Sequence, residues 1–447
     1  MARVLLIGAG PLPHPTAKRL GFPQLRLGRF RDALATEHSV RVVCLGSEQG
    51  GSSEEDGFSG IHSVDPDSRG WLERLRRLAE PADTIVSAGP YLPGEAACLI
   101  AEDRPVWADL PGDPFAELQA VALAEGIQLS TARVAAARSA ALAVLSRADR
   151  ISVISERQRL ALTGQLGVLG RLLPGAPPQG VGVVVPISYQ LGLARGLPRR
   201  RRPGSPMVVA LCGGFNTWLD DRGIAMALQR ALDEAPGLSV VVTGGAIAGH
   251  YAAGFERFDA WRRKTPHRSR IVLRGWVQHE ALTPILSAAH VGLYLDRPGC
   301  EALLGSRTRV HLFSWAGLEV VGSPDSDLTH QMATAGLLHP APTDPRETGA
   351  LLARLYRDGS DGKMAARANA WLTQQFHPDR VLRPLRQWAQ QPERAPPAPH
   401  FDAVLEENAR LRQALRDIHQ SPTWRALSVL HRAGRRMLGD PEPDPEP

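Results

Sequence analysis

The chain opens with a short apolar run that ends in glycine, and this feature recurs along most of its length. Residues 4–7 are Val-Leu-Leu-Ile, followed by Gly8-Ala9-Gly10. Such a run predicts a strand buried on both faces, as in a parallel sheet, and the glycines predict a loop at its carboxyl end. Similar runs follow at residues 40–45, 84–87, 105–108, 151–154 and 181–185. We therefore predict a parallel sheet for the first half of the chain.

Helical patterns separate these runs, at residues 71–78, 115–124 and 131–145. Strands that alternate with helices predict a doubly wound α/β domain. The same rhythm restarts after residue 206, with expected strands at 208–212, 238–243, 270–274, 290–295 and 319–322. A chain of 447 residues, 43% hydrophobic and 22% charged, can bury two such cores. The predicted fold class is α/β, with two Rossmann-like doubly wound domains and a helical C-terminal tail.

Changes in composition mark the expected domain boundaries. Residues 191–206 contain glycine, proline and four consecutive arginines, so we expect a solvated linker there. Residues 396–399, which are rich in proline, predict a second linker. The expected units are an N-terminal domain over 1–188, a C-terminal domain over 207–390 and a helical tail over 400–438.

The tail combines apolar and basic residues. Trp424, Leu427, Leu430 and Leu438 alternate with arginines, which indicates an amphipathic basic helix able to lie on an anionic membrane surface. Alternatively, this segment and residues 405–415 pair as a coiled coil or pack on the body. No apolar run has the length of a membrane span, and the four cysteines are scattered. We expect a cytoplasmic protein, with the tail as a candidate contact to the inner face of the membrane.

The net charge constrains the partners of this chain. A net charge of +6 is modest for this length and is compatible with an anionic small molecule or acidic lipid headgroups. No basic patch interleaved with aromatic residues occurs in the main body, so nucleic acid is not expected as a partner.

Two glycine loops in the second half are candidate phosphate sites. The first, Gly213-Gly214, follows a strand and continues to Asn216 and Thr217, whose side chains can donate hydrogen bonds. The second, Gly244-Gly245, ends the next strand at the same edge of the sheet. A helix expected from residue 221, with Arg222 in its first turn, adds a favourable dipole and a cation. Each loop can also be a tight turn that needs glycine for steric reasons alone.

A second group of candidates follows the later strands. Arg274 offers a cation for a diphosphate, and Trp276 offers an aromatic surface for a base, unless Trp276 is a core residue. Downstream, Asp296 and Glu301 can accept hydrogen bonds from ribose hydroxyls. Gly305 and Ser306 predict a turn that opens a helix toward phosphate.

Two arginines of this segment can carry catalytic charge. Arg307 and Arg309 could neutralise a leaving nucleotide diphosphate. They are two positions apart and point to different sides of a helix, so we expect one at most to meet the phosphates, with Arg307 as the candidate.

The first half supplies one candidate catalytic residue, Asp109, which follows a strand at residues 105–108. A carboxylate at this edge could orient or deprotonate an acceptor hydroxyl. The alternative is that Asp109 caps the next helix.

In this order, these motifs resemble the donor half of a GT-B-fold glycosyltransferase, most closely of the family 4 (group 1) type. The resemblance covers residues 208–324 and includes the run Glu301-x-x-Leu-Gly-Ser-Arg-Thr-Arg309. It implies a nucleotide-sugar donor as substrate, no separate cofactor, no bound metal and retention of configuration. It further implies a saccharide or lipid-linked acceptor, a role in cell-surface polysaccharide or glycolipid synthesis, and Gly10 in an acceptor-side loop under the donor phosphates.

The sequence departs from the family pattern at three places. The family carries a second glutamate eight residues after the first, and Arg309 stands there instead. The usual Lys-Gly is Arg222-Gly223, and the usual Gly-x-Pro-Val-Val is residues 317–321, Gly-Leu-Glu-Val-Val. The missing glutamate favours an alternative, a non-catalytic assembly protein that kept the fold.

A third reading is a nicotinamide-dependent oxidoreductase, because Gly8-Ala9-Gly10 follows the first strand. The dinucleotide fingerprint needs a third glycine where Pro13 stands, so this signal is weak.

Overall fold

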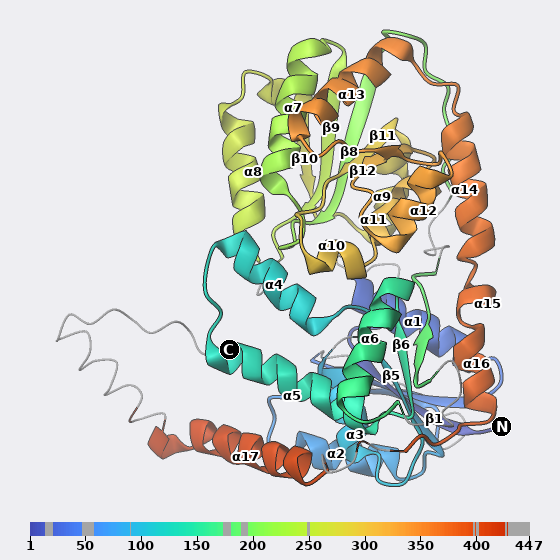
Figure 1. The fold of residues 1–447 in the computed structure, drawn as a ribbon, viewed down its shortest axis with the longest axis vertical. Helices are drawn as coiled ribbons and strands as arrows, with labels where there is room; N and C mark the ends of the chain where they lie inside the picture. The colour runs from blue at the N-terminus through green and yellow to red at the C-terminus, as the bar shows by residue number, and fades with distance from the viewer. Residues whose placement is uncertain are drawn as a thin grey trace.

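The computed structural model describes residues 1–13, 21–46, 58–89, 91–172, 180–188, 195–247, 251–396, 398, 402–424 and 427. Two α/β domains are stacked along the long axis of the molecule (Figure 1). Each has a parallel sheet with helices on both faces, as the alternating pattern predicts.

The first sheet has seven strands in the order β3-β2-β1-β4-β5-β6-β7. The strands are β1 (Arg3–Ala9), β2 (Ser39–Leu45), β3 (Gly60–Val64), β4 (Thr84–Ala88), β5 (Val106–Asp109), β6 (Arg150–Val153) and β7 (Gly182–Val184). The helices are α1 (Phe22–Leu34), α2 (Trp71–Ala79), α3 (Leu92–Ile100), α4 (Pro114–Glu125), α5 (Thr131–Arg147) and α6 (Glu156–Val168). The strand order reverses between β1 and β4, where an open sheet forms a crevice.

The second sheet has six strands in the order β10-β9-β8-β11-β12-β13. The strands are β8 (Met207–Gly214), β9 (Leu238–Gly245), β10 (Ile271–Gly275), β11 (Val291–Tyr294), β12 (Glu319–Gly322) and β13 (His339–Pro340). The helices are α7 (Asp221–Glu234), α8 (Ala253–Lys264), α9 (His279–Ser287), α10 (Cys300–Leu304), α11 (Thr308–Trp315), α12 (Asp327–Thr334), α13 (Pro345–Asp358) and α14 (Lys363–Gln375), with the 3-10 turn η1 (Arg268–Arg270).

Burial on both faces explains why the central strands are mainly apolar and do not alternate with polar residues. In β1, Leu5 and Ile7 belong to the core on one face of the sheet, whereas Val4 and Leu6 belong to the core on the other. All four side chains are fully buried. A half-exposed strand would alternate apolar and polar residues instead.

The chain crosses back to the first domain after α14 (Figure 1). Helices α15 (Pro378–Val381) and α16 (Arg383–Gln390) pack on α1 and the first sheet, and Trp388 lies 5.5 Å from Trp107, ring centre to ring centre. The expected C-terminal domain over 207–390 is therefore too long, because residues 378–390 complete the core of the first domain.

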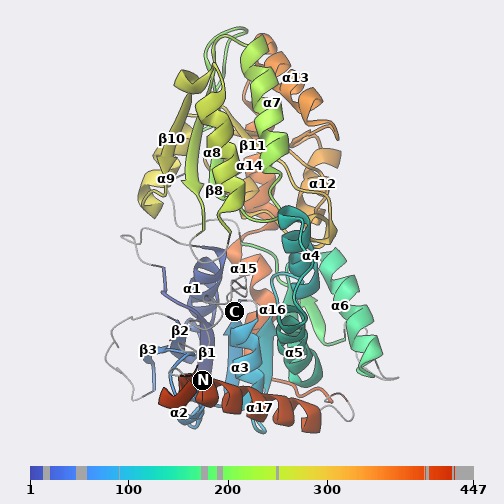
Figure 2. The same ribbon diagram turned by 90° about the vertical axis from the view of Figure 1, so that its left-hand side faces the viewer.

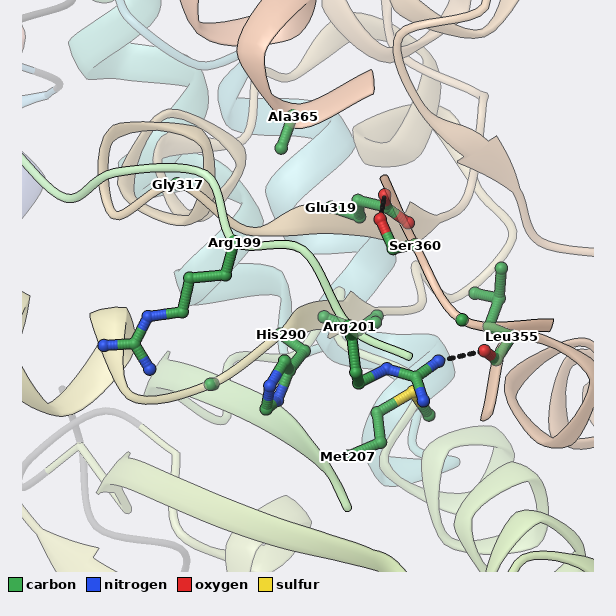
Figure 3. Close-up of a pocket in the computed structure, with 12 residues that line it drawn as sticks. Arg199, Arg201, Met207, His290, Gly317, Glu319, Leu355, Ser360 and Ala365 are labelled. Atoms are coloured by element: carbon green, nitrogen blue, oxygen red, sulfur yellow. Dashed lines mark hydrogen bonds between the residues drawn. The ribbon is translucent and has the colours of Figure 1, made fainter. Parts of the chain in front are cut away.

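The linker between the domains is less solvated than its four arginines suggest. Arg201 is only 7% exposed, and its guanidinium donates to the carbonyls of Leu355 and Tyr356 at the end of α13 (Figure 3). These acceptors stabilise the buried charge, whereas Arg199, Arg200 and Arg202 are exposed, as expected. The hollow beside Arg201, about 10 Å³, lies at the amino end of the second sheet and is too small for a nucleotide.

The tail begins with α17 (Asp402–Gln420), which lies along the outer end of the first domain (Figures 1 and 2). This matches the alternative in which the tail packs on the body. Of the basic segment 424–438, only residues 424 and 427 are described, so the predicted membrane helix lies largely outside the described residues. Within the described ranges, no helix has both the length and the apolar character that a membrane span requires.

Candidate functional site

The domains meet through segments that follow the carboxyl ends of their strands. Helix α4 packs on α10, Ser155 Oγ donates to the Leu304 carbonyl over 2.8 Å, and Arg157 pairs with Asp327 at 2.9 Å. Beside these contacts, side chains of both domains, including Ser306, line a cavity of about 320 Å³. The carboxyl edge of an open parallel sheet is where such folds bind ligands.

The two predicted glycine loops lie side by side at this edge. Gly213 pairs with Gly244 and Gly214 with Gly245, and the φ angles of Gly213 and Gly244 are 89° and 91°. A Cβ at Gly244 would lie 2.3 Å from the Gly213 carbonyl oxygen, whereas a Cβ at Gly213 would meet nothing within 4 Å. Gly244 thus allows the strands to approach, and Gly213 leaves its backbone open toward a ligand.

The loop after β8 contains two buried polar atoms without a hydrogen-bond partner in the described part of the chain. They are Oγ1 of Thr217, a residue 2% exposed, and Oδ1 of Asn216. An unsatisfied buried polar group costs about 1–3 kcal/mol. A ligand that supplies these partners would recover that cost, and a phosphate oxygen can accept from the Thr217 hydroxyl.

Ion pairs outside the loop hold it in place. Asp221, 2% exposed, accepts from Arg257 at 2.8 and 2.9 Å and from Arg297 at 3.0 Å. Arg297 also donates to the Thr217 carbonyl at 3.1 Å. The loop is therefore anchored by the segment that follows β11.

The predicted acidic residues form a second cluster around Arg307. Its Nε donates to both carboxylate oxygens of Asp296, at 2.8 and 2.9 Å, and its Nη1 lies 3.3 Å from Glu301. All three side chains are almost fully buried. Burial raises the pKa of Glu301 to about 7, against the opposing effect of Arg307, and Oε2 of Glu301 has no partner among the described residues.

Of the two arginines, Arg309 and not the predicted Arg307 lies beside the glycine loops. Arg307 is already saturated by the two carboxylates and by the Glu301 carbonyl. Arg309 is only partly buried, and its Nη2 donates to the Gly214 carbonyl at 3.1 Å, which places its guanidinium beside the glycine loops. The two side chains therefore diverge, and whether either meets a phosphate stays a prediction.

The turn between the carboxylate cluster and α11 is closely packed. A Cβ at Gly305 would lie 2.5 Å from both Arg307 Nη1 and Glu301 Oε1, so glycine is required there. Ser306 is partly exposed and faces the interdomain cavity, not the glycine loops.

The other residues predicted to bind the nucleotide sugar in the second domain lie around the glycine loops or on the surface. Trp276 is partly buried and donates Nε1 to the Ala246 carbonyl at 3.0 Å, and a Cβ at Gly214 would contact its ring at 3.7 Å. Trp276 therefore lies beside the loops. Arg222 and Arg274 are exposed, and in the described ranges no hydrogen bond or ion pair joins them to the other candidates.

Asp109 occupies a structural position that does not suit the predicted general base. It is fully buried, and its carboxylate accepts from Arg26 at 2.7 and 2.9 Å, from Gly89 N at 3.1 Å and from Ser152 Oγ at 2.6 Å. Four donors leave no free oxygen to accept a proton. The capping alternative is also incorrect, because Asp113 caps α4.

Gly10, predicted to belong to an acceptor-side loop, directly follows the carboxyl end of β1. Its N–H donates to the Leu45 carbonyl at 3.1 Å, and its carbonyl accepts from Gln24 Nε2 at 3.0 Å. Both backbone groups are therefore already used within the first domain.

One group of residues at the domain contact is not visible in the sequence pattern. The Tyr91 hydroxyl donates to Glu117, and Gln119 Oε1 accepts from Cys300 N at 2.8 Å across the interface. Burial raises the pKa of Glu117. The charge of Glu117 in turn helps to raise the pKa of Glu301, and both carboxylates help to raise the pKa of Tyr91. Carboxylates of both domains are therefore brought together when the domains meet.

No family model matches the sequence, and no curated protein matches it. Solved structures match over most of the chain despite low identity. Sucrose-phosphate synthase from Thermosynechococcus elongatus has a TM-score of 0.62 at 15% identity, covering 88% of this chain and 99% of its own. HepE from Anabaena, in complex with UDP and glucose, has a TM-score of 0.60 at 12% identity, covering 87% and 100%. A UDP-forming trehalose-phosphate synthase from Burkholderia xenovorans has a TM-score of 0.60 at 11% identity, covering 87% and 99%. These structures are two-domain GT-B proteins.

This chain has the GT-B fold. The fold class and the resemblance predicted from the sequence are confirmed at this level.

Within the GT-B fold, the sequence missed the residues whose roles depend on distant partners. Arg26, Arg257 and Glu117 lie in helices, and nothing in their local pattern distinguishes them from surface charges. A charged residue at a position where the helix is otherwise buried, such as Arg26 among the apolar residues of α1, is the one hint that the sequence offers.

The two glycines with matching φ angles provide a test of the GT-B glycine loops. Gly244→Ala should lower the free energy of unfolding by more than Gly213→Ala, because both pay about 1–3 kcal/mol for positive φ but only Gly244 gains a backbone clash. Urea denaturation of both variants measures the difference. Equal losses would show that the strands can separate to admit the Gly244 Cβ.

Proposed function

We propose that the chain is a glycosyltransferase that binds a nucleotide sugar at the carboxyl edge of the second sheet. The observation that carries this proposal is the loop after β8. Among the described residues, its Thr217 Oγ1 and Asn216 Oδ1 are buried without hydrogen-bond partners beside the open backbone of Gly213. Arg309 lies next to the same loop. The Thr217 hydroxyl, as a donor, and the cation of Arg309 suit a diphosphate, whereas Asn216 Oδ1 is an acceptor and suits a hydroxyl or N–H group of the same ligand.

The chemistry follows from where charge develops. Transfer breaks the bond between the anomeric carbon and the diphosphate oxygen. The acceptor hydroxyl oxygen bonds to that carbon, and its proton passes to the departing diphosphate oxygen. Negative charge accumulates on the leaving diphosphate, where Arg309 and the Thr217 hydroxyl stabilise it. In this proposal Trp276, which lies beside the loops, contacts the base. Glu301 accepts from hydroxyls of the donor once the domains separate enough to admit it.

The finer parts of the proposal rest on the sequence resemblance and on the neighbours. HepE was solved with UDP and with glucose, which supports a uridine nucleotide and a saccharide as the first compounds to test. We further propose retention of configuration, turnover without added metal, and a saccharide or lipid-linked acceptor bound by the first domain. A cytoplasmic location, with the basic tail against a membrane, belongs to the same proposal.

Nucleotide affinity is the direct test. Calorimetric titration with UDP, GDP, ADP and dTDP should find one nucleotide that binds, and Arg309→Met should weaken that binding by about 10- to 100-fold through loss of a charge-assisted hydrogen bond. Thr217→Val should weaken it less. The control is Arg263→Met, an exposed arginine of the same domain paired with Asp259. If no nucleotide binds, or if all three variants bind alike, the proposed site is wrong.

A non-catalytic protein with the same fold is the second candidate. Arg309 favours it, because it stands where the resembling family carries a glutamate, and the burial of Asp109 removes the expected base. Release of free nucleotide from a bound nucleotide sugar distinguishes the two. Binding without release under any acceptor, metal or pH tested would support the non-catalytic candidate.

A further inference from the structure

Helix α17 is held on the first domain by polar contacts. Arg412 pairs with Glu95 of α3 at 2.5 Å, and Gln420 donates to the Asp67 carbonyl at 2.7 Å. The helix packs against α5. Its contact with the body therefore depends on ion pairs and hydrogen bonds.

The opposite face of α17 is apolar and uncovered by the described residues. Leu411, Leu415 and Ile418 are 50%, 53% and 48% exposed. Their spacing of four and three residues places them on one stripe. A helix on a globular surface normally turns such a stripe toward the core, so this orientation indicates an external partner.

The charges beside the apolar stripe indicate whether a membrane or a protein covers it. Across residues 402–420 the helix carries four carboxylates and three arginines, which does not favour an anionic lipid surface. The exposed face is centred on Ala414, with Arg410 before it and Asp417 after it. Within the helix, Arg410 pairs with Glu407 at 2.8 Å and Asp417 accepts from Gln413 at 3.0 Å, so each keeps its charge at the surface.

These charges are complementary to a second copy of the same helix. If two α17 helices cross antiparallel at Ala414, Leu411 faces Ile418 of the other copy, and Arg410 faces Asp417 of the other copy. A parallel crossing would instead place Arg410 and Asp417 on opposite sides of the pair, away from each other. The small side chain of Ala414 allows a close approach at the crossing.

We infer that α17 is a homodimerisation helix that pairs antiparallel with α17 of a second copy of this chain. The interface is isologous, since each residue contacts the same counterpart in both directions. Helix α17 lies at the end of the molecule far from the domain contact, so both clefts stay open in the dimer (Figures 1 and 2).

Sedimentation velocity of the full chain over a range of concentrations tests the inference. We expect a reversible dimer. Leu411→Asp and Leu415→Asp should each raise the dimer dissociation constant at least about tenfold. Leu160→Asp, at a position 59% exposed on α6, is the matched control and should not change it.

Charge exchange tests the antiparallel arrangement. Arg410→Asp and Asp417→Arg should each weaken the dimer, and the double variant should restore it because the pairs re-form in reverse. A monomer at every concentration would overturn the inference, as would a dimer that the stripe variants leave intact. Binding of the monomer to anionic vesicles, lost in Leu415→Asp, would overturn it in favour of a membrane. Circular dichroism and the melting temperature confirm that each variant is folded, and none of these results depends on the proposed enzymatic function.

Discussion

Asp109→Asn is expected to destabilise the first domain by about 3–5 kcal/mol, the usual consequence of removing one partner of a buried ion pair. The substitution keeps the shape of the side chain but leaves Arg26, 4% exposed, without its counter-charge. Arg26 also donates to the Pro186 carbonyl at 3.0 Å. Removing the Asp109 charge should therefore also weaken the attachment of the segment after β7 to the first domain. Urea unfolding followed by tryptophan fluorescence suits this test, because Trp107 is fully buried in that core.

A double-mutant cycle isolates the pair from other effects. Arg26→Met combined with Asp109→Asn should cost much less than the sum of the single losses, since no unpaired charge remains. A catalytic Asp109 predicts the reverse pattern, with turnover lost and stability kept. Unchanged stability in Asp109→Asn would therefore contradict the structural role.

Glu301→Gln should become increasingly stabilising relative to the wild type as the pH rises. Burial, together with the charges of Glu117 and Asp296 and against the attraction of Arg307, raises the pKa of Glu301 from 4.5 to about 7. Between these values the folded protein retains a proton that the unfolded chain has lost. The stability that Glu301 contributes is therefore complete below pH 4.5 and is lost as the pH approaches 7, by about 3 kcal/mol at 1.36 kcal/mol per pKa unit.

Comparing the unfolding free energies of the two proteins at pH 5 and pH 8 measures this effect. Glutamine has no titrating proton, so the difference between variant and wild type should grow by about 2–3 kcal/mol over that interval. Glu256→Gln, at a surface position of α8, is the control. A difference that is independent of pH would show that Glu301 ionises normally.

The sequence predicts the strands well where both faces are buried and poorly elsewhere. The core strands of both sheets are mainly apolar, with isolated polar residues such as Arg41 and Thr243, and their expected ranges agree with the structure to within a few residues. Strand β3 was missed because it contains Gly60, His62 and Ser63 and is only partly buried. Strand β13 was missed because it has two residues.

At the candidate site, spacing identified the segments but not the roles of individual side chains. The two-residue separation of Arg307 and Arg309 predicts that their side chains diverge. Which of them is held by carboxylates and which lies beside the glycine loops depends on Asp296, eleven residues before Arg307, and on Gly214, ninety-five residues before Arg309. Asp109 looks like an exposed strand-end carboxylate until Arg26 is placed beside it by the pairing of β1 and α1 with β4 and β5. Such long-range partners leave no local pattern.

The return of the chain to the first domain has a consequence for cutting and truncating this protein. A protease that cleaves between the exposed Arg199 and Arg200 would leave two fragments that stay associated, because Trp388 and Leu385 of the second fragment are buried in the core of the first. A gene fragment that ends at residue 188 would in turn expose the surface of Trp107 and aggregate. To express the first domain alone, residues 378–390 must be supplied with it, in cis or as a co-expressed peptide.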